Sequence, residues 1–316
     1  MPKQEQKGSA AQNSAYVITG PTSGIGLSTA YELARHGTVV LVGRDRTKLD
    51  NVKQGIEQSG GKAIPVVCDL SDQASVHRAA AEIIALGLPI TAVLNNAGIN
   101  TLRPAKSAQG WDLAFATNHL GPFAFTEALV SHLRDGTNIL FVASAIEDPE
   151  RKPVKAMRLG GGRYISAEAS ARGEWKPGGS SMPGMDSYST SKQCVLATAI
   201  AFSRQFPRLR INAIEPGITP ATGLGRDANA FGRFLFSAVI TRLPPFARYR
   251  STPKQAGHVI TKVLTDPSTG TGVYFDEKGR PMSGSVQVSD PIFQDRVVAE
   301  TRALLAGVPS LAGVRR

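Results

Sequence analysis

Tyr188 and Lys192 stand four residues apart in the stretch YSTSK, and this spacing places both side chains on one face of a predicted helix. A phenol has an ordinary pKa of about 10, which makes it a poor base at neutral pH. A neighbouring ammonium group favours the phenolate and is expected to lower the pKa of the phenol. The pair therefore predicts a group that donates and accepts protons, although the same spacing also occurs by chance on surface helices.

Two other polar residues are candidates for functional roles. Ser144 closes the predicted strand 138–143, where its hydroxyl can hydrogen-bond a substrate oxygen. Asn118 lies in FATNHLG, inside a predicted helix, where an asparagine is unfavourable unless it has a tertiary role.

A glycine-rich turn, TGPTSGIG at residues 19–26, follows a predicted strand and precedes a predicted helix. Gly20, Gly24 and Gly26 allow the backbone to turn sharply and to approach a pyrophosphate, whose charge the helix N-terminus favours. Tight turns also need glycine without any ligand. The location of this glycine-rich turn between a strand and a helix therefore predicts a dinucleotide-binding site.

Gly43 and Arg44 end the second predicted strand, about twenty residues further on, where NAD enzymes of this fold usually place an acidic residue on the ribose. Gly43 fills the acidic position, and the guanidinium of Arg44 suits a ribose 2′-phosphate by charge and geometry. This pattern predicts NADP(H) as the cofactor. A solvent-facing Arg44, and contact of the ribose with Asp45, are the alternatives.

Polar residues also end the third and fourth predicted strands. Asp69 can accept a hydrogen bond from an adenine amino group, or it can cap the helix that begins near Ser71 and Asp72. NNAG, at residues 95–98, lies at the carboxyl edge of the predicted sheet, where ligands bind in open α/β folds. Such a sequence can also form a simple turn.

Short apolar runs rich in β-branched residues alternate with helix-like segments. The predicted strands are 15–19, 38–43, 63–68, 90–94, 138–143, 210–214 and 272–275, and the predicted helices are 24–36, 45–58, 72–86 and 107–133. This alternation predicts an α/β fold, a Rossmann-type doubly wound parallel sheet. We expect one domain, residues 14–308, after a disordered tail at 1–13.

Two segments interrupt the alternation. Residues 145–187 are rich in glycine and show no periodicity, which predicts an insertion loop before Tyr188. Residues 228–251 contain an apolar helix-like run that ends at Pro244 and Pro245, and we interpret them as a substrate lid.

Composition excludes several classes of protein. With 41% hydrophobic and 19% charged residues, the chain is typical of a soluble globular enzyme, and no apolar run approaches the roughly 18 residues that span a bilayer. Cys68 and Cys194 have no metal-ligand spacing and no disulfide framework, so we expect a cytoplasmic protein without a metal.

The net charge of +11 is dispersed without interleaved aromatic residues, which argues against a nucleic-acid partner. A basic bias at residues 204–254 is interpreted as a solvated face; anionic substrates, cofactor phosphates or a membrane surface are alternatives.

Together these motifs resemble the short-chain dehydrogenase/reductase family. TGPTSGIG, NNAG, Asn118, Ser144, Tyr188-x3-Lys192 and Pro216-Gly217 occur in the order and spacing of that family, over roughly residues 14–275. The resemblance implies that Tyr188 is the general acid and base, and that Lys192 lowers the pKa of Tyr188 and holds the nicotinamide ribose. It also implies that Ser144 polarises the carbonyl group and that Asn118 supports a water-linked proton relay. The implied reaction is hydride transfer between the nicotinamide and a carbonyl or alcohol carbon.

The resemblance also places the cofactor against residues at the strand ends. The expected cofactor contacts are Gly20, Ser23, Gly24, Ile25, Gly26, Arg44, Asp69, Leu70, Asn96, Ala97, Gly98, Tyr188, Lys192, Pro216, Gly217 and Thr219.

Within the family, TNHLGPF, SKQCVL, PGITPATGL and DPSTGTGVYF resemble the branch of retinol dehydrogenases and light-dependent protochlorophyllide reductases. Members act on bulky hydrophobic substrates, so we predict that the chain interconverts a carbonyl and an alcohol on a retinoid-, steroid- or polyketide-like molecule. The pigment reductases carry a cysteine directly after Pro-Gly, where this chain has Ile218, and this disfavours reduction of a C=C bond. Cys194 matches a helix cysteine of that group, but a cysteine there more often fills the core.

The sequence leaves two alternative functions open, and the resemblance implies an oligomeric state. A non-catalytic NADP-binding sensor is disfavoured because such proteins usually lose the tyrosine or the lysine. Peripheral membrane contact through 228–251 is less favoured than a buried lid helix. The family resemblance also implies a homodimer or tetramer.

Overall fold

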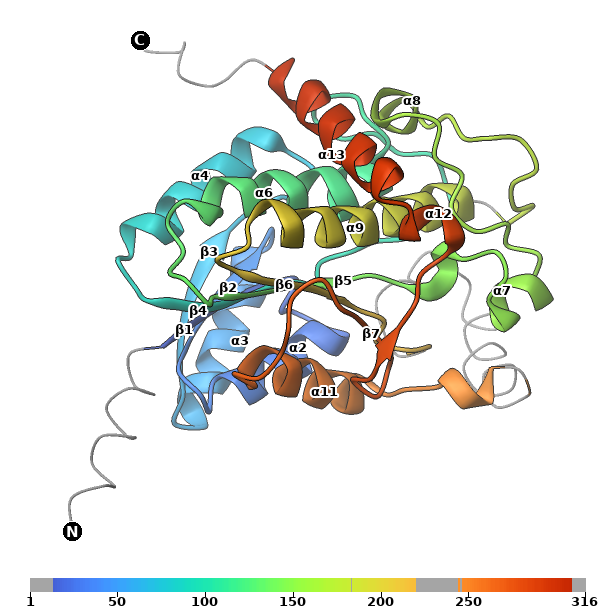
Figure 1. Ribbon diagram of the computed structural model, residues 1–316. Coiled ribbons are helices and arrows are strands. Elements are labelled where there is room, and N and C mark those ends of the chain that lie inside the picture. The colour runs from blue at the N-terminus through green and yellow to red at the C-terminus, as the bar shows by residue number, and fades with distance from the viewer. Residues whose placement is uncertain (1–13, 183, 220–243, 245, 309–316) are drawn as a thin grey trace.

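The computed structural model describes residues 14–182, 184–219, 244 and 246–308. The tail predicted at 1–13 and most of the lid predicted at 228–251 therefore lie outside the described residues. The described chain forms a sheet between two layers of helices (Figure 1).

The described residues form one sheet with the strand order β3-β2-β1-β4-β5-β6-β7-β8. The strands are β1 (Ala15–Thr19), β2 (Thr38–Gly43), β3 (Lys62–Val67), β4 (Ile90–Asn95), β5 (Asn138–Val142), β6 (Arg210–Ile214), β7 (Tyr274–Phe275) and β8 (Pro281–Met282). All neighbours pair in parallel except β7 and β8. The chain changes its direction of progress between β1 and β4, and such a switch point opens a crevice at the carboxyl ends of the strands. The predicted doubly wound fold is confirmed.

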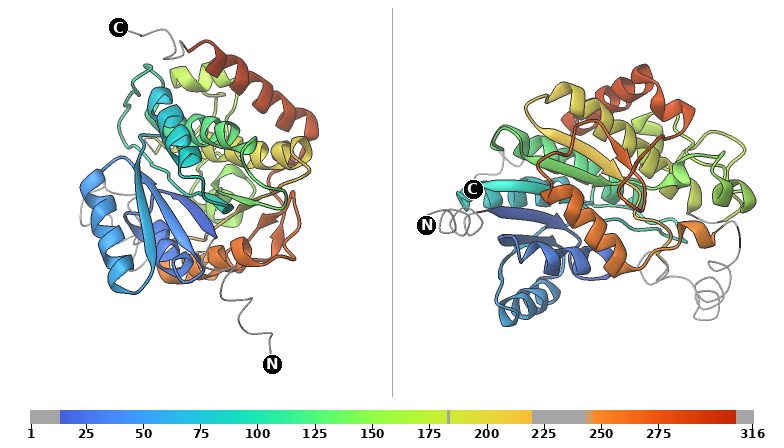
Figure 2. Two further views of the ribbon diagram at one scale, coloured as in Figure 1. Left: turned by 90° about the vertical axis from the view of Figure 1, so that its left-hand side faces the viewer. Right: turned by 60° about the horizontal axis from the view of Figure 1, so that its bottom comes forward.

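Side chains on each strand alternate between two apolar layers, because successive residues point to opposite faces. In β1, Val17 belongs to one layer, whereas Tyr16 and Ile18 belong to the other. The helices of the first layer are α4 (Gln73–Ala85), α6 (Gly121–Val130) and α9 (Met185–Gln205), and those of the second are α2 (Gly24–Leu33), α3 (Arg46–Gln58) and α11 (Pro253–Thr265). Figure 2 shows both layers from two further directions.

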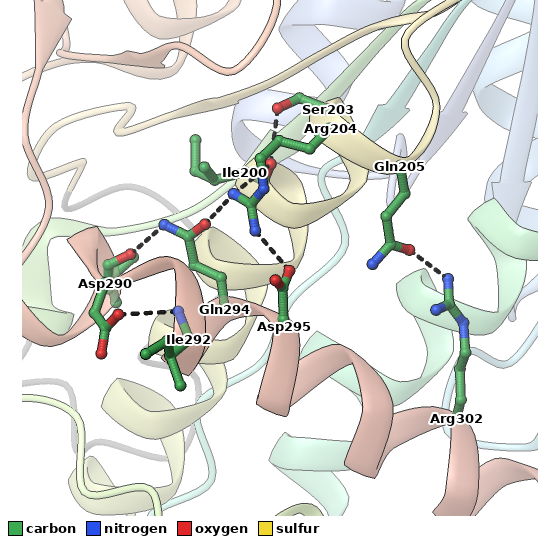
Figure 3. Close-up of polar contacts among 10 residues, drawn as sticks. Ile200, Ser203, Arg204, Gln205, Asp290, Ile292, Gln294, Asp295 and Arg302 are labelled. Atoms are coloured by element: carbon green, nitrogen blue, oxygen red, sulfur yellow. Dashed lines mark hydrogen bonds and ion pairs between the residues drawn. The ribbon is translucent and has the colours of Figure 1, made fainter.

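α13 (Pro291–Ala306) lies over the outer side of α9 (Figure 1). Nη2 of Arg204 pairs with Oδ1 of Asp295 at 2.6 Å, and Nη2 of Arg302 donates to Oε1 of Gln205 at 2.7 Å (Figure 3). The helix that carries Tyr188 is thereby fixed between the sheet and a second helix.

Other arginines of the basic stretch at 204–254 also make internal contacts. Arg208 donates to the carbonyl oxygen of Leu133 at 2.5 Å, and Arg210 donates to that of Gly136 at 3.0 Å. Arg204 and Arg208 are nevertheless exposed, so these contacts do not contradict the interpretation of this stretch as a solvated face.

The insertion at 145–187 has more structure than its glycine content predicts. It contains η2 (Ala145–Glu147), α7 (Lys152–Ala156) and α8 (Ala167–Arg172), and α9 begins within it. Tyr164 is fully buried, and its hydroxyl donates to Oε2 of Glu300 on α13 at 2.7 Å. A tertiary contact, which leaves no periodicity in the local sequence, anchors this segment.

Most predicted elements differ from the structure only by small shifts of their ends, but one helix and one strand differ in form. The helix predicted at 107–133 begins at α5 (Leu113–Phe115), and a π-helical turn, η1 (Ala116–Leu120), separates α5 from α6. The strand predicted at 272–275 is reduced to β7, and β8 was not predicted, because a two-residue strand carries no alternating pattern.

Candidate active site

The turn after β1 is built from contacts that only glycine permits. Gly20 and Gly24 have φ angles of +68° and +56°, a region that other residues rarely adopt. A Cβ on Gly26 would lie 2.2 Å from the carbonyl oxygen of Gly20, so no larger residue could bring α2 this close. Ser23 precedes α2 and makes no side-chain capping bond, which leaves the first N–H groups of the helix available to a phosphate.

Arg44 lies exposed at the edge of a cleft where β2 ends. Its charged neighbours have other partners: Asp45 caps α3 by accepting from the backbone N of Lys48 at 3.1 Å, and Arg46 pairs with Asp50 at 2.9 Å. Among the residues that the structure describes, Arg44 makes no hydrogen bond or ion pair. The alternative that assigns the ribose to Asp45 loses support, because that carboxylate is engaged by the helix.

Asp69 lies in the wall of the same cleft, after β3. Its Oδ1 accepts from the backbone N and the hydroxyl of Ser71, at 2.9 and 2.7 Å. Asp72, not Asp69, caps α4 by accepting from the backbone N of Ala74 at 3.1 Å. The helix-cap interpretation of Asp69 is therefore wrong, and its carboxylate stays at the cleft beside Leu70.

Thr19, the last residue of β1, joins the glycine-rich turn to the NNAG segment. Its hydroxyl oxygen accepts from the backbone N of Asn96 and of Ala97, both at 3.0 Å. The side-chain amide of Asn96 donates in return to the carbonyl oxygen of Thr19 at 2.9 Å. The sequence pattern does not single out Thr19, because a buried threonine at a strand end has no characteristic spacing.

Asn118 lies in the π-helical turn η1, a form of helix that is frequent at functional sites. Its Nδ2 donates to the carbonyl oxygen of Ile99 and to Oγ of Ser191, both at 2.9 Å, and its Oδ1 accepts from the backbone N of Ile99 at 2.8 Å. Asn118 does not line the cleft itself. It lies behind Gly98, where a Cβ would come within 3.4 Å of Oδ1 of Asn118 and 3.5 Å of Nζ of Lys192.

α9 brings Tyr188 and Lys192 to the cleft on one helix face, as their spacing predicts. Nζ of Lys192 donates to the carbonyl oxygen of Val142 at 2.7 Å and lies 5.8 Å from the centre of the Tyr188 ring. Ser144 follows β5, lines the same cleft and hydrogen-bonds the Tyr188 hydroxyl.

Burial governs the protonation of this pair. It raises the pKa of Tyr188 well above its ordinary value of 10, the negative charge of Glu215 raises it further, and the hydrogen bond with Ser144 opposes the change. Burial lowers the pKa of Lys192 to about 8, while Glu215 acts in the opposite direction. The pKa of Tyr188 is thus raised and not lowered as expected, because desolvation is the largest cause and Lys192 is not among the causes. Tyr188 holds its proton and is set up as a donor.

One cleft of about 1270 Å³, open to solvent, joins these parts. Ser144 and every expected cofactor contact line it. The lining residues that the sequence did not place among those contacts are Thr22, Val42, Gly43, Cys68, Ile99, Thr117, Val142 and Ala143. Most are apolar residues at strand ends, which a sequence pattern cannot separate from the core.

The described end of the predicted lid lies at the mouth of the cleft. Ile218, after β6, donates its backbone N to the carbonyl oxygen of Tyr249 at 2.8 Å and accepts from the backbone N of Ser251 at 2.9 Å. The Tyr249 ring, in η5 (Ala247–Tyr249), also lies 4.7 Å from the guanidinium of Arg151 in the insertion. The insertion and the lid segment therefore meet beside the loop after β6.

The described ranges contain neither a metal-binding cluster nor a membrane-spanning helix. No group of three histidine, cysteine, aspartate or glutamate side chains in those ranges could hold a metal ion. None of the helices there is long and apolar enough to cross a bilayer. Cys68 and Cys194 are both buried and unbridged, so Cys194 packs in the core.

Comparison with known proteins agrees with this geometry. The family model described as short chain dehydrogenase matches residues 14–154. Protochlorophyllide reductase B of Hordeum vulgare is 28% identical over 296 residues, which cover 87% of this chain and 73% of the relative. An uncharacterized protein from Mycobacterium paratuberculosis superposes with a TM-score of 0.64 at 25% identity, covering 93% of this chain and 94% of that one. A blue fluorescent protein from a metagenomic library, solved in complex with NADPH, has a TM-score of 0.62 at 19% identity, covering 85% and 97%.

Proposed function

We propose that this chain is an oxidoreductase of the short-chain dehydrogenase/reductase family, and that it uses NADP(H) to interconvert a carbonyl group and an alcohol on a bulky hydrophobic substrate. The observation that carries this proposal is the single cleft that joins the glycine-rich turn and Arg44 to Ser144, Tyr188 and Lys192.

The residues of the cleft fit a dinucleotide phosphate. The missing side chain of Gly26 lets α2 begin directly against the carbonyl oxygen of Gly20. No side-chain cap occupies the first N–H groups of α2, which therefore suit a pyrophosphate. The exposed guanidinium of Arg44, with Gly43 in place of an acidic residue, suits a 2′-phosphate. A protein with this fold was solved in complex with NADPH, which supports NADP(H) as the cofactor.

When bound, the nicotinamide supplies the hydride that adds to the carbonyl carbon. Tyr188 gives its phenolic proton to the carbonyl oxygen as the C–O π bond opens, so an O–H bond forms at the oxygen and a C–H bond at the carbon. In the opposite direction Tyr188 takes that proton back. Ser144, which is in hydrogen-bonding contact with Tyr188, holds the substrate oxygen.

Lys192 and Asn118 support Tyr188 from one side of the cleft. The ammonium group of Lys192 stabilises the tyrosinate that remains after proton transfer, and we assign it the nicotinamide ribose as a second partner. Asn118 holds Ile99 and Ser191 in register, which keeps the loop after β4 against α9.

Reduction of a C=C bond in a pigment is the second candidate, and the similarity to protochlorophyllide reductase B of Hordeum vulgare favours it. Ile218 argues against it, because the pigment reductases carry a cysteine at that position. A cytoplasmic location and a homodimer or tetramer stay predictions.

A panel of bulky ketones and aldehydes, with NADPH consumption followed by absorbance, tests the proposal. We expect turnover with at least one apolar carbonyl compound and none in the Tyr188→Phe variant. Tight NADPH binding without turnover of any carbonyl or alcohol, in either direction, would contradict the proposal and favour an NADP-binding sensor.

A further inference from the structure

Glu215 lies where β6 leaves the sheet, directly before Pro216 and Gly217 in the cleft wall. Its backbone N donates to the carbonyl oxygen of Phe275 at 2.8 Å, which continues the pairing of β6 with β7. Only 7% of the residue is exposed. A carboxyl group is almost never buried in this way unless it has partners.

The partners of Glu215 come from two loops of the cleft. Its Oε2 accepts from the backbone N of Ala145, the residue directly after Ser144. The backbone N–H of Gly217 is a second donor to the same carboxyl group. One carboxylate therefore joins the loop that carries Ser144 to the loop that carries Pro216 and Gly217, and two N–H donors favour its charged form.

Charged and titratable groups face Glu215 from every element around it. Burial raises the pKa of Glu215, and the neighbouring Glu277 adds to this, whereas the two N–H donors and Arg151 lower it. The groups that respond to its charge are Tyr188 and Lys192 on α9, Tyr274 on β7 and Glu147 on η2.

We propose that Glu215 is a positioning residue for the reaction proposed above: its carboxylate fixes the Ser144 loop against the Pro216–Gly217 loop and places a negative charge next to Tyr188 and Lys192. This inference rests on the proposed function. A negative charge there keeps the proton on Tyr188 and keeps Lys192 as an ammonium ion, because it opposes the loss of either proton. Glu215 thus prepares the pair for proton donation, that is, for the reductive direction.

Glu215→Gln separates the two parts of this role. The amide oxygen can still accept from Ala145, but the charge is gone, so both Tyr188 and Lys192 release their protons at lower pH. In a profile of kcat/KM for carbonyl reduction against pH, we expect the alkaline limb to move down by about one pH unit. Glu215→Ala loses the acceptor as well, and we expect a lower kcat across the whole range.

Glu147→Gln is the matched control. Glu147 is another buried carboxyl group near Ser144, but it accepts from the backbone N and hydroxyl of Ser285, at 2.7 and 2.6 Å, and not from Ala145. It is not among the groups that shift the pKa of Tyr188 or of Lys192. We expect its alkaline limb to coincide with that of the wild type.

A second measurement needs no substrate. The Lys192 side chain can be followed by NMR in protein with 13C-labelled lysine, its signal assigned with Lys192→Arg. We expect its titration midpoint to fall by about one pH unit in Glu215→Gln and to stay in place in Glu147→Gln.

The possible outcomes distinguish the role of Glu215 from the proposed function. An unchanged Lys192 midpoint or an unchanged alkaline limb in folded Glu215→Gln would overturn the role of Glu215 and leave the proposed function standing. A lowered midpoint in a protein that reduces no carbonyl would defeat the proposed reaction, and would leave the charge of Glu215 acting on a pair that serves some other purpose.

Discussion

The ammonium group of Lys192 is anchored on the carbonyl oxygen of Val142, 2.7 Å away, at the end of β5. Only 4% of Lys192 is exposed, so this bond replaces most of the contact with water that an ammonium group would otherwise have. This bond joins the catalytic helix to the strand that presents Ser144, and the burial of its ammonium group makes the stability of the protein depend on pH.

Burial lowers the pKa of Lys192 from its ordinary value of 10.5 to about 8. Between these two values the unfolded chain binds more protons than the folded one, so the contribution of Lys192 to the free energy of unfolding rises with pH over that window. The full change is about 3 kcal/mol. In denaturant unfolding, we expect the stability of Lys192→Met relative to the wild type to fall by about this amount between roughly pH 7 and pH 11. Lys53→Met, on the surface of α3, should show no such change.

Tyr188→Phe should remove the proton donor and leave the cofactor site intact. We expect kcat to fall by about 10²–10⁴, the usual contribution of a general acid, with the Kd of NADPH changed by less than about threefold. Tyr164→Phe is the matched control, since it also removes a buried hydroxyl, the one that binds Glu300. It should cost about 1 kcal/mol of stability and keep turnover. Near-normal kcat in Tyr188→Phe would show that another group donates the proton.

Asn118→Ala should weaken both the fold and the reaction. It leaves the backbone N and carbonyl oxygen of Ile99 without their partner, which costs about 1–3 kcal/mol per unsatisfied group. We expect a lower melting temperature and a kcat reduced by about tenfold or more, because the loop after β4 loses its register against α9. Asn95→Ala breaks a bond to Thr126 behind the cleft and should lower stability alone. Equal kinetics in the two variants would limit Asn118 to a structural role.

Wild-type protein should prefer NADP(H) over NAD(H) by one to two powers of ten in kcat/KM, about 1.4–2.8 kcal/mol after allowance for the exposure of Arg44. Arg44→Ala should reduce this preference, and Gly43→Asp should shift it towards NAD. Arg46→Ala is the control, because Arg46 is paired with Asp50. A wild-type enzyme that used NAD equally well would show that Arg44 does not bind a phosphate.

The purified protein with NADPH should not convert protochlorophyllide in the light. Ile218 cannot supply the thiol that the pigment reductases carry after Pro-Gly, and its backbone is held by Tyr249 and Ser251. The measurement is the absorbance of chlorophyllide after illumination, with a pigment reductase as positive control. Light-dependent product from the wild type would promote the second candidate function.

Local patterns in the sequence are sufficient to predict the parallel sheet and most of the cleft. Strands such as β1 and β2 are continuous apolar runs, and the helix that follows β1 starts at Gly24, whose positive φ angle favours glycine. These signals lie within a few neighbouring residues. Tyr188 and Lys192 likewise show their relation through helical spacing alone.

Features set by distant contacts could not be predicted. The anchor between Tyr164 and Glu300 joins residues 136 positions apart, and the carboxyl group of Glu215 reaches Ala145 across 70 positions. The direction of the pKa change at Tyr188 could not be predicted either, because it depends on how completely three-dimensional packing removes water from the phenol.

The cover that α13 forms over α9 has a consequence for synthesis. Arg204 and Asp295, which hold the two helices together, are 91 positions apart, so a ribosome must add that many residues before the cover exists. At the usual rates of elongation the outer side of α9 stays open for roughly five to twenty seconds. During that time Phe202 and its apolar neighbours are within reach of chaperones and of other nascent chains. The catalytic helix is therefore sheltered only long after most of the residues of the site have been made.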